Sequence, residues 1–251
     1  MFGLFQPECP VDQAAKRWIE VRLQWLARQF GLGVFTDNAV VLPTREFFPF
    51  AVRGNEESVR NLLNKVCVYM NADSTLIDLE LFQNQSALWL VNEGGNYLPT
   101  GAAGTFHQQH GRTVIRVEAT ELENLSDLVG TIAHELAHLR LMGENRMTGR
   151  EFDNELVTDL TVVFHGLGIF VGNSPRNWDS QYTTWPGSDL RCPEYMTLPM
   201  FGYALAHAAW HRREQKPAWA KFLSYELRGC FKQGLRYLEK TGDSDFRPSE
   251  L

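Results

Sequence analysis

Residues 126–142 read SDLVGTIAHELAHLRLM and carry the most informative pattern in the chain. Ser126 is a typical N-cap residue and a glycine follows the stretch, so we expect one continuous helix. At 3.6 residues per turn, His134 and His138 lie one turn apart on one face, about 6 Å along the axis. Both imidazoles can therefore converge on one metal ion. Glu135 is rotated by about 100° from His134, beside the metal, where a carboxylate can act as general base.

The residues around the two histidines are uncharged. They are Ile132, Ala133, Leu136, Ala137 and Leu139. A helix with so apolar a surface is expected to be largely buried. Neutral histidines buried without a partner are costly, and a metal ion would supply that partner.

A second motif, NELVTD at residues 154–159, follows HELAH along the chain. The two motifs together resemble the zinc-binding pair of the gluzincin branch of the zincin metallopeptidases. The resemblance covers mainly residues 112–171. It implies one zinc ion held by His134, His138 and Glu155. It further implies that Asp159 accepts a hydrogen bond from the first histidine, with Asn154 beside it in the surrounding shell.

The helical spacing agrees with this assignment, since Glu155 and Asp159 are one turn apart, so one can ligate the metal while the other orients an imidazole. Glu155 follows His138 by 17 positions (155 − 138), slightly closer than in familiar gluzincins. Glu144 occupies the slot of the third ligand in the metzincin branch, but Leu141 stands where that branch has glycine. We prefer Glu155 and expect Glu144 to be a solvated residue beyond the helix end.

The rest of the chain predicts an α+β protein with a zincin-like fold. In this prediction a small mixed or antiparallel sheet and the HExxH helix form an N-terminal lobe (residues 1–145). A helical C-terminal lobe (residues 146–251) carries the third ligand, and residues 1–251 form one compact catalytic domain. Further helices are expected at residues 11–30, 55–69, 154–171, 198–213 and 217–238, and strands at residues 76–82, 87–91, 101–108 and 112–117.

Three smaller expectations concern the surroundings of the metal. The strand containing Thr113, Val114 and Ile115 is a candidate edge strand for binding an extended peptide, or simply part of a hairpin turning at residues 110–111. Tyr203 is a candidate for stabilising an oxyanion, with packing as the alternative for it and for the histidines that follow it on the same helix face. Gly166 is expected to let its helix approach the HELAH helix.

Composition limits the class of protein. The 251 residues include 44% hydrophobic residues, enough for a sizeable core. A net charge of −6 without a cationic stripe argues against nucleic acid as a partner. No apolar run long enough to cross a bilayer and no N-terminal signal segment are evident, so we expect no membrane association and a cytoplasmic location. The four cysteines are far apart and are expected to be free thiols outside the metal site.

The sequence also resembles uncharacterised bacterial proteins in which HELAH precedes a TDL…GLGIF segment and a helix similar to FGYALAHAAW. The leading hypothesis is a cytoplasmic zinc metallopeptidase or a related amide hydrolase, with a peptide or protein substrate. The alternative is a non-catalytic, zinc-stabilised module that binds another protein. Glu135 favours the enzyme, because a structural ion needs no base and usually has four protein ligands.

Overall fold

The computed structural model describes residues 7–50, 55–82, 90–91, 97–98, 104–109, 112–118, 124–174 and 183–247. The chain divides into two compact units. The helical unit comprises Met1–Leu42 and Thr148–Leu251, and the sheet unit comprises Pro43–Met147. Helices combined with a small sheet confirm the α+β class.

The sheet unit contains the HELAH helix. Its elements are α3 (Glu56–Met70), the 3-10 helix η1 (Ser74–Leu76), β1 (Ile77–Phe82), β2 (Leu90–Val91), β3 (Tyr97–Leu98), β4 (Gly104–Gln109), β5 (Arg112–Glu118), α4 (Leu125–His138) and the π-helix η3 (Leu139–Gly143). The predicted helix at residues 55–69 is confirmed as α3. Asn55 caps it by accepting a hydrogen bond from Ser58 N at 2.9 Å.

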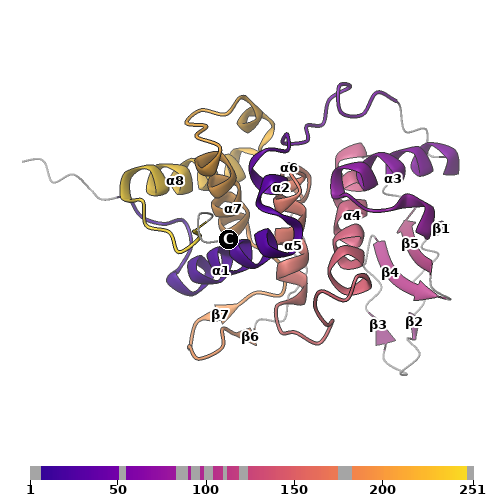
Figure 1. Cartoon of the computed structure of the whole chain (residues 1–251), viewed down its shortest axis with the longest axis horizontal. Coiled ribbons are helices and arrows are strands. Elements are labelled where there is room, and N and C mark those ends of the chain that lie inside the picture. The colour runs from indigo at the N-terminus through magenta and orange to yellow at the C-terminus, as the bar shows by residue number, and fades with distance from the viewer. Residues whose placement is uncertain are drawn as a thin grey trace, which may run out of the picture. The chain divides into compact units, whose positions relative to one another are not determined.

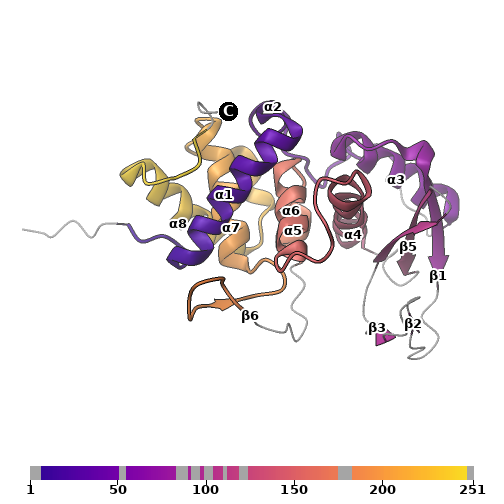
Figure 2. The ribbon, with the colours of Figure 1, turned by 60° about the horizontal axis from the view of Figure 1, so that its bottom comes forward.

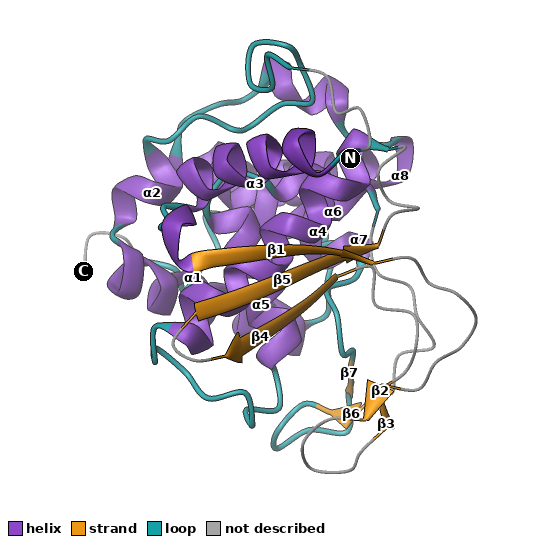
Figure 3. Ribbon diagram, turned by 90° about the vertical axis from the view of Figure 1, so that its right-hand side faces the viewer, coloured by secondary structure: helices purple, strands orange, loops and turns teal. Residues whose placement is uncertain are grey.

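A mixed three-stranded sheet has the order β1-β5-β4, as Figure 3 shows. β5 pairs with β1 in parallel and with β4 antiparallel. The antiparallel pair is the predicted hairpin, although its turn at residues 110–111 lies outside the described residues. The helices α3 and α4 lie on one face of this sheet (Figures 1 and 2). Burial of Ile77, Ile115 and Val117 supplies the apolar surface on which such packing depends.

The helical unit contains the remaining helices. Its elements are α1 (Gln13–Phe30), α2 (Leu32–Thr36), α5 (Asn154–Phe164), α6 (Gly168–Asn173), β6 (Thr183–Thr184), β7 (Arg191–Cys192), α7 (Leu198–His211), the 3-10 helix η4 (Ala218–Phe222) and α8 (Tyr225–Thr241). The predicted helix at residues 217–238 is therefore two elements, η4 and α8. Ser224 caps α8, which explains the fresh start after η4.

The N-terminal helix differs from its predicted place. α1 contacts α5 and α7 in the helical unit, whereas the sequence assigned it to an N-terminal lobe of residues 1–145. The reason is its inward face, since Ile19, Leu23 and Leu26 are completely buried in this unit. The predicted boundary near residue 145 lies close to the second boundary between the two units.

Two glycines decide how helices in this unit meet. Gly166 has φ +87° and ends α5, so the predicted helix at residues 154–171 is broken into α5 and α6. A Cβ at Gly166 would lie 2.8 Å from the carbonyl oxygen of Ala39, so this glycine allows the close approach of residues 39–40 of the same unit, a neighbour that the sequence did not predict. A Cβ at Gly202 would lie 2.5 Å from Cβ of Cys230, so this glycine permits the tight packing of α7 against α8.

All four cysteines are free thiols, as predicted. Among the described residues, no helix combines the length and the apolar character needed to traverse a bilayer.

Candidate metal centre

The helix α4 carries both histidines of the HELAH motif. It begins at Leu125, and Asn124 is its N-cap, with Oδ1 accepting a hydrogen bond from Ser126 N at 3.0 Å. Ser126 is thus inside the first turn and is not the cap that the sequence suggested. Asparagine is an equally good N-cap, and Asp127 then lies in the first turn, where the helix dipole favours negative charge.

His134 and His138 face each other across one turn of α4. Their Nε2 atoms are 3.1 Å apart, and their ring centroids are 4.8 Å apart with the planes at 81°. Two nitrogens bound to one tetrahedral zinc at 2.0–2.1 Å would be separated by about 3.4 Å. The pair is therefore spaced for a shared ion, or for one imidazole donating a hydrogen bond to the other. His134 is 1% exposed and His138 is half-buried.

Glu135 lies between the two histidines in sequence and is 3% exposed. A carboxylate so deeply buried is costly without a polar neighbour, and Glu135 makes at least one hydrogen bond, ion pair or other electrostatic interaction. Its place on α4, rotated from His134 by a fraction of a turn, is the place that the sequence predicted for a general base.

A π-helix follows His138 directly. The sequence predicted one continuous helix to Met142, but α4 ends at His138 and Leu139–Gly143 form the π-turn η3. Its wide turn is seen in the bond from Glu144 N to the carbonyl oxygen of Leu139, which is five residues earlier, at 3.0 Å. Such π-turns are uncommon and occur often at functional sites.

Glu144, the alternative third ligand, has two cationic partners. Its carboxylate accepts hydrogen bonds from Arg140 at 2.5 Å and from Arg146 at 2.8 Å, and its side chain is 31% exposed. These pairs agree with the prediction that Glu144 is a partly solvated residue beyond the end of α4 and not a metal ligand.

The helix α5 carries the second motif. Glu155 is in its first turn and is half-buried. Asn154 precedes it and donates from Nδ2 to the carbonyl oxygen of Gly149 at 3.0 Å. Asp159, one turn after Glu155, is 3% exposed and accepts a hydrogen bond from Met196 N at 3.0 Å. This hydrogen bond joins Met196, just before α7, to the middle of α5.

Among the described residues, one group of side chains offers enough ligands for a metal ion. It consists of His134, His138 and Glu155, whose ligand atoms all lie within 4.8 Å of one another. Two imidazoles and one carboxylate are a donor set typical of catalytic zinc, which keeps its fourth position for water or substrate. The three residues brought together are the three that the sequence named.

Tyr203 has a different place from the one predicted. It is completely buried in the helical unit, and its hydroxyl donates to Oε1 of Glu20 at 2.7 Å. Glu20 is also fully buried and accepts hydrogen bonds from Lys16 Nζ at 3.1 Å and Asp245 N at 3.0 Å. Burial raises the pKa of Tyr203, and the adjacent carboxylate raises it further. A tyrosine enclosed in this way is part of the core, so we withdraw it as the oxyanion-stabilising group.

Electrostatics keep Glu20 ionised despite its burial. Burial alone raises the pKa of this carboxyl, but the nearby His207 and hydrogen bonds from Asp245 N and Tyr203 outweigh that effect and lower the pKa to about 2. His207 lies beside this carboxylate, with its Nε2 3.5 Å from Oε1 of Glu20. Glu20 is therefore a buried carboxylate that stays ionised inside the helical unit.

The predicted substrate strand is also corrected. β5, which contains Thr113, Val114 and Ile115, is the central strand of the described sheet. Ile115, for example, pairs with Leu79 of β1 on one side and with Phe106 of β4 on the other. Because both edges of the backbone are already paired, β5 cannot add a peptide strand. The sequence predicted both β1 and β5 as strands but gave no sign that the two pair in parallel.

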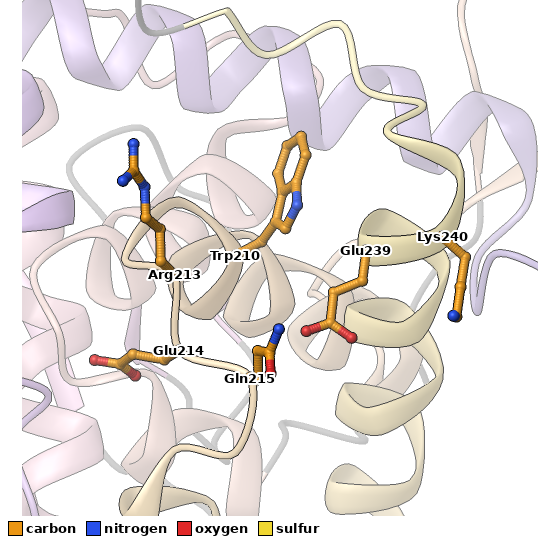
Figure 4. A pocket seen from close by; sticks show the side chains of 6 residues that line it. All are labelled: Trp210, Arg213, Glu214, Gln215, Glu239 and Lys240. Carbon is orange, nitrogen blue, oxygen red and sulfur yellow. The ribbon is translucent and has the colours of Figure 1, made fainter.

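A hollow of about 370 Å³ opens in the helical unit between the C-terminal ends of α7 and α8. Of the described residues, those that line it are Trp210, Arg213, Glu214, Gln215, Glu239 and Lys240 (Figure 4). Its lining carries charges of both signs and includes none of the predicted metal ligands. We assign the candidate site from the ligand geometry and not from this hollow.

Sequence reasoning missed the residues that support the start of α5. Asp153 is 1% exposed and accepts hydrogen bonds from Trp18 Nε1 at 2.7 Å and from Arg22. Only weak features of the sequence pointed to these residues. Asp153 directly precedes the NELVTD motif, and Arg22 follows Trp18 by one turn on a helix that is distant in the chain. Nothing local in the sequence connects the two segments.

Comparison of this chain with protein-family models, curated proteins and solved structures yields no match. The assignment of function therefore depends on the side chains themselves.

Proposed function

We propose that this protein is a zinc-dependent metallopeptidase, or a related amide hydrolase, with a zincin-like fold of the gluzincin type. The supporting observation is the grouping of His134, His138 and Glu155, with ligand atoms within 4.8 Å of one another. The HELAH and NELVTD motifs predicted the same three ligands independently of any coordinates.

The donor set fits zinc in chemistry and nearly in spacing. The 3.1 Å between the two Nε2 atoms is close to the separation of about 3.4 Å expected for ligands of one tetrahedral zinc. The ligand atoms of the whole group lie within 4.8 Å of one another.

The bound ion would supply Lewis-acid activation of a water molecule and of the scissile carbonyl. Glu135 removes the proton of the attacking water and later delivers it to the leaving amine. Its burial restricts the carboxylate to few orientations and excludes bulk water, which suits this proton transfer. The resemblance implies that Asp159 orients one imidazole through a hydrogen bond, and its carboxylate accepts a hydrogen bond from Met196 N at 3.0 Å.

The substrate would bind as an extended strand along β4. Among the described strands, β4 has β5 as its only partner and lies at one edge of the three-stranded sheet. A peptide can add to such an edge through backbone hydrogen bonds. This replaces the predicted role of β5 and retains the same mode of binding.

The test combines metal analysis with peptide digestion. We expect the purified chain to bind zinc at unit stoichiometry and to cleave members of a peptide library. Glu135→Gln should retain zinc and lose activity by about 10²–10⁴-fold, the usual contribution of a general acid–base group. Glu155→Gln should lose both zinc and activity.

Glu144→Gln is the matched control. It changes a nearby glutamate on the same segment that the structure pairs with Arg140 and Arg146, so zinc content and activity should be preserved. Full activity in Glu135→Gln would refute the catalytic assignment. Zinc at unit stoichiometry without any cleavage that depends on Glu135 would favour the zinc-stabilised binding module instead.

A further inference from the structure

The helix α5 begins beside a buried ion pair that the proposed chemistry does not use. The side chain of Asp153 is completely enclosed, and three donors surround it. Arg22 binds both of its oxygens, with Nε to Oδ2 at 2.8 Å and Nη2 to Oδ1 at 2.8 Å. Trp18 donates from Nε1 to Oδ2 at 2.7 Å. Arg22 thus binds the carboxylate in a bidentate manner, and Trp18 donates a third hydrogen bond to it.

Asp153 occupies the N-cap position of α5 but does not cap it. Its side chain makes no hydrogen bond to the N–H groups of the first turn. Three other helices are capped by their N-cap side chains, namely α1 by Asp12, α3 by Asn55 and α8 by Ser224, whereas Thr197 does not cap α7. Aspartate is among the best N-cap residues, so turning it away sacrifices a favourable interaction. The orientation of Asp153 therefore serves the contact with α1.

This contact fixes the backbone that carries Glu155. Only Asn154 separates Asp153 from Glu155, and the carbonyl oxygen of Asp153 accepts the first helical bond of α5, from Val157 N at 2.9 Å. Arg22 also reaches Oε2 of Glu151, at 3.2 Å, so it holds the chain on both sides of the turn into the helix.

Trp18 and Arg22, the two donors to Asp153, are both largely buried. Trp18 and Arg22 are one turn apart on α1, and Trp18 is 8% exposed. The ring of Trp18 packs against that of Trp185, with centroids 5.8 Å apart. Trp185 is 4% exposed and lies next to the short strand β6, so α1, α5 and this segment meet at Asp153.

Stability alone does not account for such an arrangement. A buried ion pair gains little over well-packed apolar residues, because removing both charges from water is costly. What an Arg–carboxylate pair with two parallel hydrogen bonds adds is a fixed geometry. We propose that Arg22 and Trp18 are positioning residues that act through Asp153 to hold Glu155 in place as a metal ligand. This inference rests on the proposed function, because it requires that Glu155 ligates zinc.

Two conservative variants test it. Arg22→Lys keeps the positive charge but cannot form the bidentate pair of hydrogen bonds to Asp153. Trp18→Phe keeps the aromatic packing but removes the Nε1–H donor. We expect each to weaken zinc binding by about 10–100-fold, as measured by competition with a chelator, because partners that orient a ligand have effects of this size. The visible spectrum of the cobalt(II)-loaded protein, which reports coordination geometry, should shift in both variants.

Ile19→Val is the matched control. Ile19 is the neighbour of Trp18 on α1 and is completely buried, so its truncation lowers the melting temperature of the metal-free protein. Zinc affinity and the cobalt spectrum should remain those of the wild type. If Arg22→Lys does not fold, Trp18→Phe alone decides the question.

The outcomes separate this inference from the proposed function. A wild-type chain that binds no zinc overturns both. Wild-type zinc binding that is lost in Glu155→Gln but unchanged in Trp18→Phe overturns only the positioning role. The same holds if Ile19→Val weakens zinc binding as much as the two test variants, since the effect would then be one of stability.

Discussion

Two helices of this chain carry histidines one turn apart, and their surroundings differ. On α4 the Nε2 atoms of His134 and His138 are 3.1 Å apart, with the rings nearly perpendicular. On α7 the rings of His207 and His211 are stacked, with centroids 5.9 Å apart and planes at 17°. The first arrangement aims two nitrogens at a common point, whereas the second aligns two flat faces.

The acids near the two pairs differ in the same way. Glu155 joins the α4 pair as a third potential ligand. Glu20, the acid near His207, is already occupied by Tyr203 and Lys16. Burial lowers the pKa of His207, so it stays neutral at neutral pH, and Phe246 packs against both rings of the α7 pair. Helical spacing therefore places two histidines side by side on both helices, and the α4 pair differs from the α7 pair in having Glu155 as a third potential ligand.

The largest expected effect separates the two pairs by metal binding. His138→Ala should weaken zinc binding by about 10³-fold, because the affinity of a zinc site is shared among few ligands at roughly 3–4 kcal/mol each. His211→Ala should leave the affinity unchanged. Isothermal titration of both variants measures this difference. Equal losses in the two variants would show that the distinction between the pairs is false.

The next effect concerns the buried charge of Glu20. Its pKa in the folded protein is lowered to about 2 from 4.5, so it stabilises the fold above about pH 4.5, and this contribution disappears as the pH falls towards about 2. The full contribution is no more than about 3 kcal/mol. Urea unfolding at a series of pH values should show this decline in the wild type. Glu20→Gln should be less stable at neutral pH and should lack this part of the acid dependence.

Glu80→Gln is the control for that experiment. Glu80 pairs with Arg116 at 2.7 Å, but its side chain is 50% exposed. Removing an exposed ion pair changes stability by about 0–1 kcal/mol. An acid profile altered as strongly by Glu80→Gln as by Glu20→Gln would contradict the special role of the buried cluster.

The smallest effect tests the corrected place of Tyr203. Tyr203→Phe removes one hydrogen bond to an ionised, buried carboxylate and should lower the free energy of unfolding by about 2 kcal/mol. Zinc affinity and the turnover number should not change, because the hydroxyl is directed at Glu20. A large fall in turnover with unchanged stability would restore its catalytic assignment.

The sequence predicted the parts of this protein that depend on local pattern. The HELAH spacing, the helix around Val59 and Leu62, and the pairing of Glu155 with the histidines all follow from residues close together in the chain or from a paired motif. The sequence could not predict features set by distant segments. The parallel partner of β5, the burial of Tyr203 against Glu20 and the grip of Arg22 on Asp153 each join segments with no shared local signal.

The remaining differences between prediction and structure concern where helices begin and end. Asn124 replaced Ser126 as the cap because two good capping residues lie within one turn of each other. The π-turn after His138 and the break at Gly166 interrupt runs whose hydrophobic period continues, and periodicity alone does not register such interruptions.

The order in which the chain is synthesised has a consequence for how it folds. The sheet unit, Pro43–Met147, is continuous in the chain, so the HELAH helix and all its packing partners within that unit are synthesised before α5 and α7. The opening segment, by contrast, must wait for α5 and α7 before its apolar face can be covered. We expect the inserted unit to fold first during translation, so that α4 and its two histidines are packed before α5 joins α1 and α7.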